Sequence, residues 1–108
     1  MDVTRLLVHC PDLATARALA AALLDARLVA CANIYGEIES HYVWQGDREA
    51  GTEIPLALKT RAELIPAVAA MVEELHPYDV PPIVAQRLDY VYPPYADWVA
   101  EMTEGAHA

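Results

Sequence analysis

The order of hydrophobic patterns along the chain predicts an α+β domain built on an antiparallel sheet. Short apolar or alternating runs, which are typical of strands, are separated by two longer stretches whose apolar residues recur at helical spacing. In chain order the patterns read strand, helix, strand, strand, helix, strand, and then one further helix. This βαββαβ order is that of the ferredoxin-like fold, in which two helices cover one face of the sheet. We therefore expect residues 1–108 to form a single domain of this class.

The first strand and the first helix meet at Pro11, where the pattern changes. Residues 3–10, VTRLLVHC, predict a short buried strand. Residues 10–28 are rich in alanine and predict a helix, for which Asp12 is a suitable N-cap. The buried face of this segment is expected to carry Leu19, Leu23, Leu24 and Leu28.

The middle of the chain predicts a long hairpin. Residues 29–44 read as a long strand, with Gly36 suited to a bulge or bend. Residues 45–53, QGDREAGTE, contain two glycines and several charges and predict the turn. Residues 54–60 resume the alternation of a strand. Pro55 cannot donate a ladder hydrogen bond, so we expect it at a sheet edge or a bulge.

The last third of the chain predicts a helix, a strand and a short final helix. Apolar residues recur at helical spacing from Leu64 to Leu75, and Pro77 ends the pattern. Residues 81–88 predict the last core strand. Residues 93–102, PPYADWVAEM, predict a C-terminal helix that opens with proline in its first turn.

The charge balance excludes several classes of partner. Seven Lys and Arg residues face sixteen Asp and Glu residues, a formal net charge of -9, so we expect neither nucleic acid nor anionic membrane surfaces to bind. No apolar run approaches the roughly 20 residues of a membrane span, and no signal peptide is evident, which predicts a cytoplasmic protein. The hydrophobic fraction of 56% is high for so small a chain and predicts a homo-oligomer.

No catalytic or cofactor-binding motif stands out. Two cysteines, Cys10 and Cys31, are too few for a disulfide framework and lack the spacing of a zinc or iron–sulfur site. No GxxxxGK[ST] phosphate loop occurs. His9 and Cys10 are adjacent on a predicted strand, so their side chains point to opposite faces. We predict that the chain is not an enzyme and has no organic cofactor.

Several motifs in register carry a family resemblance. LVACANI, YVWQG, LALKTR, HPYDVPPIVA and YADWV follow one another across residues 3–102. In content and order they resemble the CutA family of divalent-cation tolerance proteins. The resemblance implies a tight homotrimer, similar in architecture to the PII signalling proteins, whose hairpins reach across to neighbouring subunits. It also implies a role in tolerance of copper and other divalent cations.

The resemblance further implies a set of residues lining clefts between subunits. Carried over motif by motif, these are Trp44, Lys59, His76, Tyr78 and Trp98. Each also has a purely structural interpretation, because exposed lysines are usually solvated and large aromatic residues usually pack a core or an interface. Pro82 and the segment YVYPPY depart from the usual family pattern.

Two residues are candidate metal ligands. His76 and Cys31 carry the imidazole and thiolate groups that suit copper. Cu(I) would favour the thiolate, whereas Cu(II) could be held by His76 with a carboxylate such as Asp79. The structural alternatives are a helix-capping role for His76 and a packed thiol for Cys31.

Three hypotheses of function follow. The first is a trimer that binds, or responds to, divalent cations. The second is a PII-like regulatory trimer that binds a small anionic metabolite or a partner protein at its clefts, where Lys59, Trp44 and Tyr78 would matter more than any thiol. A trimeric scaffold without a small ligand is a third.

Overall fold

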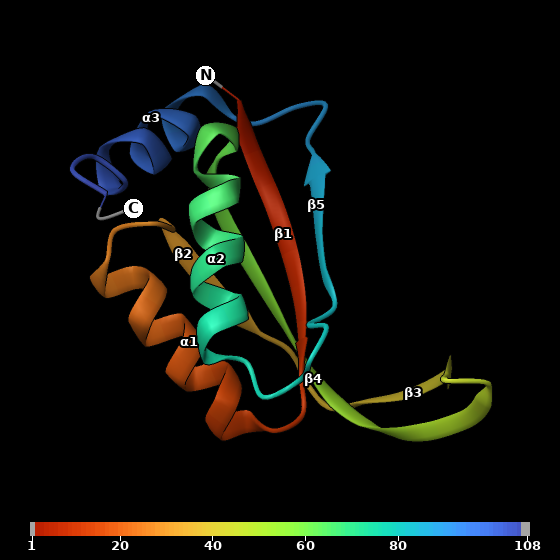
Figure 1. The fold of residues 1–108 in the computed structure, drawn as a ribbon. Helices are drawn as coiled ribbons and strands as arrows, with labels where there is room; N and C mark the ends of the chain where they lie inside the picture. The colour runs from red at the N-terminus through yellow and green to blue at the C-terminus, as the bar shows by residue number, and fades with distance from the viewer. Residues whose placement is uncertain (1, 107–108) are drawn as a thin grey trace.

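The computed structural model of the chain describes residues 2–106. Strands and helices alternate in the predicted order, with one predicted strand divided in two (Figure 1). The elements are β1 (Val3–Cys10), α1 (Leu13–Asp25), β2 (Cys31–Ile34), β3 (Ile38–Trp44), β4 (Asp47–Arg61), the 3-10 turn η1 (Ala62–Leu64), α2 (Ile65–Leu75), β5 (Ile83–Arg87) and α3 (Pro93–Met102).

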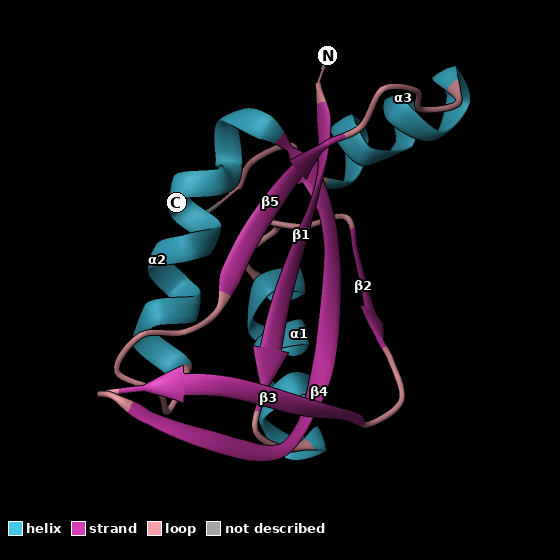
Figure 2. Ribbon diagram, turned by 90° about the vertical axis from the view of Figure 1, so that its right-hand side faces the viewer, coloured by secondary structure: helices cyan, strands magenta, loops and turns pink. Residues whose placement is uncertain are grey.

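The strands form an antiparallel sheet in the order β2-β4-β1-β5, and β3 pairs with the outer part of β4. Helices α1 and α2 lie on one face of this sheet, while the β3–β4 hairpin projects beyond it (Figures 1 and 2). This arrangement confirms the predicted ferredoxin-like class. The opposite face, which α1 and α2 leave uncovered, is called the open face below.

The core lies between the sheet and helices α1 and α2. Leu6, Val8 and Cys10 alternate along β1 and are fully buried, so every second residue of this strand faces the core. The predicted leucine face is confirmed for Leu19, Leu23 and Leu28, which are at most 1% exposed. Leu24 is 42% exposed, and its assignment to the core was wrong. It directly follows Leu23 on a helix whose buried stripe is narrow.

The hairpin turn is shorter than the sequence predicted. Gln45 and Gly46 both have positive φ, 50° and 86°, which is the requirement of a two-residue type I′ turn. Residues 47–53, predicted to belong to the turn, instead extend β4 and pair with β3, Trp44 opposite Asp47 and Ile38 opposite Glu53. Asp47, Arg48 and Glu49 of this segment are exposed on a two-stranded ribbon, where they need no buried partner, whereas Glu53 at its base is buried.

The predicted strand 29–44 is interrupted at residues 35–37, where Gly36 lies. Pro55 was predicted to lie at a sheet edge or a bulge. It lies instead on the central strand β4, opposite His9 of β1. Its carbonyl accepts from the Tyr35 amide at 3.0 Å, just beyond the end of β2. The missing N–H therefore faces the point where β4 changes partner from β2 to β3, and no regular ladder bond is lost.

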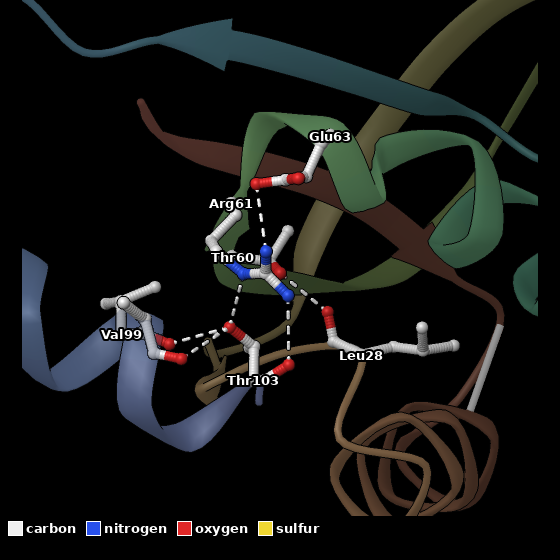
Figure 3. A network of polar contacts seen from close by, with 7 residues as sticks. Leu28, Thr60, Arg61, Glu63, Val99 and Thr103 are labelled. Carbon is white, nitrogen blue, oxygen red and sulfur yellow. Dashed lines mark hydrogen bonds and ion pairs between the residues drawn. The ribbon is translucent and has the colours of Figure 1, made fainter. Parts of the chain in front are cut away.

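Helix α3 is attached to the end of β4 by Arg61 and Thr103 (Figure 3). The Arg61 guanidinium donates from Nε to Thr103 Oγ1 at 2.9 Å and from Nη2 to the Thr103 carbonyl at 3.0 Å. It also pairs with Glu63 at 2.9 Å. Thr103 is fully buried and its hydroxyl donates to the Val99 carbonyl at 2.8 Å. These bonds satisfy the C-terminal turn of α3 and hold it against the sheet.

Candidate functional site

A cavity of about 600 Å³ lies where the β3–β4 hairpin leaves the sheet. The hairpin lines it with His41, Tyr42, Trp44 and Glu49. The body of the domain lines it with His9, Glu53, Tyr78 and Asp79. The cavity thus joins the end of β1, the bend of β4 and the loop after α2, which are far apart in the sequence but adjacent in the fold.

Glu53 is the most buried acidic group of this cavity, with the residue 9% exposed. One carboxylate oxygen lies 3.4 Å from His9 Nδ1, and the other accepts from the Tyr78 hydroxyl at 3.2 Å. Burial, followed by the charge of Glu53 and this hydrogen bond, raises the pKa of Tyr78 to about 12. The phenol therefore stays protonated at neutral pH and remains a donor to the carboxylate.

His76 lies behind Tyr78 and is 6% exposed. Its Nε2 donates to the His9 carbonyl at 2.8 Å, and its Nδ1 accepts from the Tyr78 backbone N–H at 3.1 Å. The rings of His76 and Tyr78 meet edge to face with centroids 4.7 Å apart. Both ring nitrogens are thus occupied, and binding a metal through His76 requires breaking one of these bonds. This geometry favours a structural role, in which His76 holds the loop after α2 against β1.

Cys31 lies far from His76. It pairs in register with Lys59 of β4, which pairs with Arg5 of β1. Arg5 and His9 are four residues apart on β1, so the part of the sheet next to Cys31 and the part next to His76 are roughly 13 Å apart along the strand. Cys31 Sγ instead lies 3.3 Å from the Tyr95 hydroxyl of α3. Burial and this contact raise the pKa of Tyr95 to about 12. The structure therefore does not bring the two candidate metal ligands together.

The five predicted cleft residues divide among three places. Trp44 and Tyr78 line the cavity, and His76 supports it. Lys59 lies in the sheet with its ammonium 3.4 Å from Asn33 Oδ1. Trp98 lies on α3 and stacks on Tyr95, with centroids 5.6 Å apart, which confirms that these two aromatic residues share a helix face.

His9 and Glu53 are the site residues that sequence reasoning missed. The opposite orientations predicted for His9 and Cys10 are confirmed, since Cys10 is fully buried and His9 faces the cavity. The sequence predicted a turn at Glu53. Glu53 belongs to β4, where it shares a face of the strand with Pro55, two residues further on. An extended β4 would have placed Glu53 beside the end of β1, but only the pairing of β4 with β1 shows that His9 is its neighbour.

Comparison with known proteins identifies the family of the chain. Its fold is that of the ferredoxin-like α+β proteins that carry an extended hairpin. A family model described as "CutA1 divalent ion tolerance protein" matches residues 4–102. The chain belongs to this family. The family's description refers to tolerance of divalent ions and names no reaction.

Relatives and solved structures agree with this assignment. The chain is 36% identical over 103 residues to "Protein CutA" of Mus musculus, covering 95% of this chain but 58% of that protein, so it spans little more than half of the mammalian relative. It is 39% identical to the "Divalent-cation tolerance protein CutA" of Pyrococcus horikoshii, covering 87% of this chain and 91% of the relative.

Among solved structures, CutA1 from Oryza sativa superposes with a TM-score of 0.93 at 30% identity, covering 98% of this chain and 97% of that one. The "Periplasmic divalent cation tolerance protein CutA" from Archaeoglobus fulgidus gives 0.91 at 33% identity, covering 94% and 99%. Within the described residues, no helix is long and apolar enough to cross a membrane.

Proposed function

We propose that this chain acts in divalent-cation tolerance by binding the cation, copper among others, in the cavity at the base of the β3–β4 hairpin. The observation that carries the proposal is the pair His9 Nδ1 and Glu53 Oε1, 3.4 Å apart on the cavity wall. Two ligand atoms about 2 Å from one ion lie at about this separation from each other. Imidazole with carboxylate is a donor set that suits Cu²⁺ and Zn²⁺.

The pair supplies two ligands, and a bound ion needs more. Within residues 2–106, no three His, Cys, Asp or Glu side chains are grouped closely enough to hold a metal. His41, Glu49 and Asp79 line the same cavity and are the nearest further donors in chemical type. Water, a small movement of the hairpin, or a neighbouring subunit would complete the coordination shell.

His9 thus replaces His76 as the preferred imidazole ligand, because the ring nitrogens of His76 are already bonded. Cys31 remains a separate candidate for Cu⁺ near α3, where its sulfur contacts Tyr95. The two sites would differ in metal preference, the first for Cu²⁺ or Zn²⁺ and the second for Cu⁺.

Calorimetric titration of the full chain with Zn²⁺ and with Cu²⁺ tests the proposal. We expect His9→Ala and Glu53→Gln to weaken binding at least tenfold, since each removes one of two first ligands. Glu63→Gln is the matched control, because Glu63 pairs with Arg61 outside the cavity. Equal affinity in Glu53→Gln and Glu63→Gln would exclude this site.

We also propose that the chain assembles as a homotrimer in the cytoplasm, as the family resemblance implies. Large apolar residues are exposed on β5 and beyond it, including Val84, Tyr90 and Tyr92, which are 62–74% exposed. Such exposure is unusual without a partner surface. Light scattering after size-exclusion chromatography measures the assembly directly, and a monomer at micromolar concentration would contradict it.

The second candidate function, a regulator that binds a small anion, is supported by the open face of the sheet. Arg5 and Lys59 are register partners on β1 and β4, so two cations lie side by side on this face. Within the described residues, neither forms an ion pair with a carboxylate. The hydrogen bond that Arg5 donates to the Tyr35 hydroxyl at 3.2 Å, followed by the positive charge of Arg5, lowers the pKa of that phenol.

A thermal-shift screen with nucleotides and di- and tricarboxylates separates this candidate from the first. A stabilising anion that loses its effect in Lys59→Gln would support the regulatory role. Stabilisation by Zn²⁺ alone would support the cation role.

A further inference from the structure

The cavity beside the hairpin has aromatic walls that a metal ion does not use. Tyr42 and Trp44 of β3 and Tyr78 of the loop after α2 line it from two sides. These rings are 48%, 44% and 37% exposed, so their faces are not consumed by packing within the chain. A volume of about 600 Å³ falls in the range of small-molecule sites and far exceeds the need of a single ion.

Apart from its two histidines, the ionisable side chains that give the cavity its charge are carboxylates and therefore negative. Among residues 2–106, Glu49, Glu53 and Asp79 line it, and no lysine or arginine does. The chain as a whole carries a formal charge of -9, which adds a long-range attraction for cations. Aromatic rings combined with carboxylates are the groups that bind organic ammonium ions, through the ring face and through charge-assisted hydrogen bonds.

We propose that this cavity binds a linear aliphatic polyamine. Glu49 and Glu53 are four residues apart on β4 and so lie on one face of the strand, roughly 13 Å apart along it. This separation fits ammonium groups at the two ends of an extended chain better than a single compact cation. Val80 and Pro82 supply apolar wall for the methylene groups between them.

Polyamine binding is inferred for the same cavity as the proposed function and rests on that proposal, but it depends on different side chains. Metal binding depends on the imidazole of His9, whereas polyamine binding depends on Tyr42, Trp44 and the carboxylate of Glu49. The two ligand classes compete for Glu53, so occupancy by one is expected to weaken the other.

Calorimetric titration of the full chain with spermidine, at constant ionic strength, tests the inference. We expect saturable binding that Trp44→Leu and Tyr42→Leu each weaken by roughly 2- to 30-fold, the range of a cation–π contact. Tyr35→Leu is the matched control, because Tyr35 is 48% exposed, as Tyr42 is, but does not line the cavity. Glu49→Gln, on the exposed hairpin, is a second variant that should leave folding intact and weaken binding.

The outcomes separate the two claims. If spermidine does not bind, or if Trp44→Leu and Tyr35→Leu have equal effects, the polyamine inference is wrong whatever Zn²⁺ does. Conversely, if His9→Ala abolishes Zn²⁺ binding and preserves spermidine binding, both claims hold with distinct ligands. Spermidine binding without any Zn²⁺ binding would support the inference and overturn the metal proposal.

Discussion

Replacing His76 by alanine distinguishes a structural histidine from a metal ligand. In the structure the ring bridges the His9 carbonyl and the Tyr78 amide, and the residue is 6% exposed. Each buried hydrogen bond contributes about 1 kcal/mol net, and the partners left unpaired add to the loss. The edge-to-face contact with Tyr78 contributes about 0.5–1.5 kcal/mol more. We therefore expect His76→Ala to lower the free energy of unfolding by about 2–4 kcal/mol.

The assay is chemical denaturation in the presence of a chelator, followed by circular dichroism at one fixed protein concentration, because an oligomer's apparent stability depends on concentration. His41→Ala is the matched control. The His41 side chain is 60% exposed and pairs with exposed Glu39, so its replacement should change stability by less than about 0.5 kcal/mol. If the two variants are equally stable without metal, while His76→Ala alone loses Zn²⁺ binding, the structural assignment of His76 is refuted.

Three further predictions concern the fold and its thiols. Leu23→Ala should lower the free energy of unfolding by about 2–5 kcal/mol because Leu23 is fully buried. Leu24 is 42% exposed, so Leu24→Ala should lower it much less. Equal losses in chemical denaturation would contradict the assigned core face. The hydrogen bond from the Thr15 amide lowers the pKa of Asp12 below its ordinary value. The stability of wild type relative to Asp12→Asn, measured by denaturation across pH, should therefore be constant above about pH 5 and fall as the pH drops through the folded pKa. A stability difference that grows towards acid pH would be inconsistent with this cap. Burial raises the pKa of Cys10 to about 11, so a thiol reagent at pH 8 should modify Cys31 in the native protein and Cys10 only after unfolding; rapid labelling of Cys31→Ser would contradict this.

Most of the fold was predictable because its signals are local. The Asp12 cap is present, with its carboxylate accepting from the Thr15 amide at 2.7 Å, and the helix 93–102 has the predicted bounds. Caps, prolines and helical spacing act within a few residues of one another. The hairpin turn was predicted too long because residues 45–53 contain the glycines and charges typical of a turn, although an exposed ribbon tolerates Asp47, Arg48 and Glu49 equally well.

The site was less predictable because its residues meet only through strand pairing. Trp44, His76 and Tyr78 were found from family motifs, but His9 and Glu53 meet because β4 lies beside β1. His76 and Cys31 share a chemical preference for copper, yet Cys31 lies opposite Lys59 within the sheet, whereas His76 follows α2 and bonds the His9 carbonyl near the end of β1. Residue type predicts which groups could bind a metal, whereas only the register shows which of them are neighbours.

The most direct test is to locate the bound cation by NMR. Substoichiometric Cu²⁺, which is paramagnetic, broadens amide resonances near the place where it binds. We expect selective broadening around His9, Glu53 and Tyr78, and its loss in Glu53→Gln. Broadening centred on Cys31 and α3, or unchanged broadening at the cavity in Glu53→Gln, would contradict this expectation.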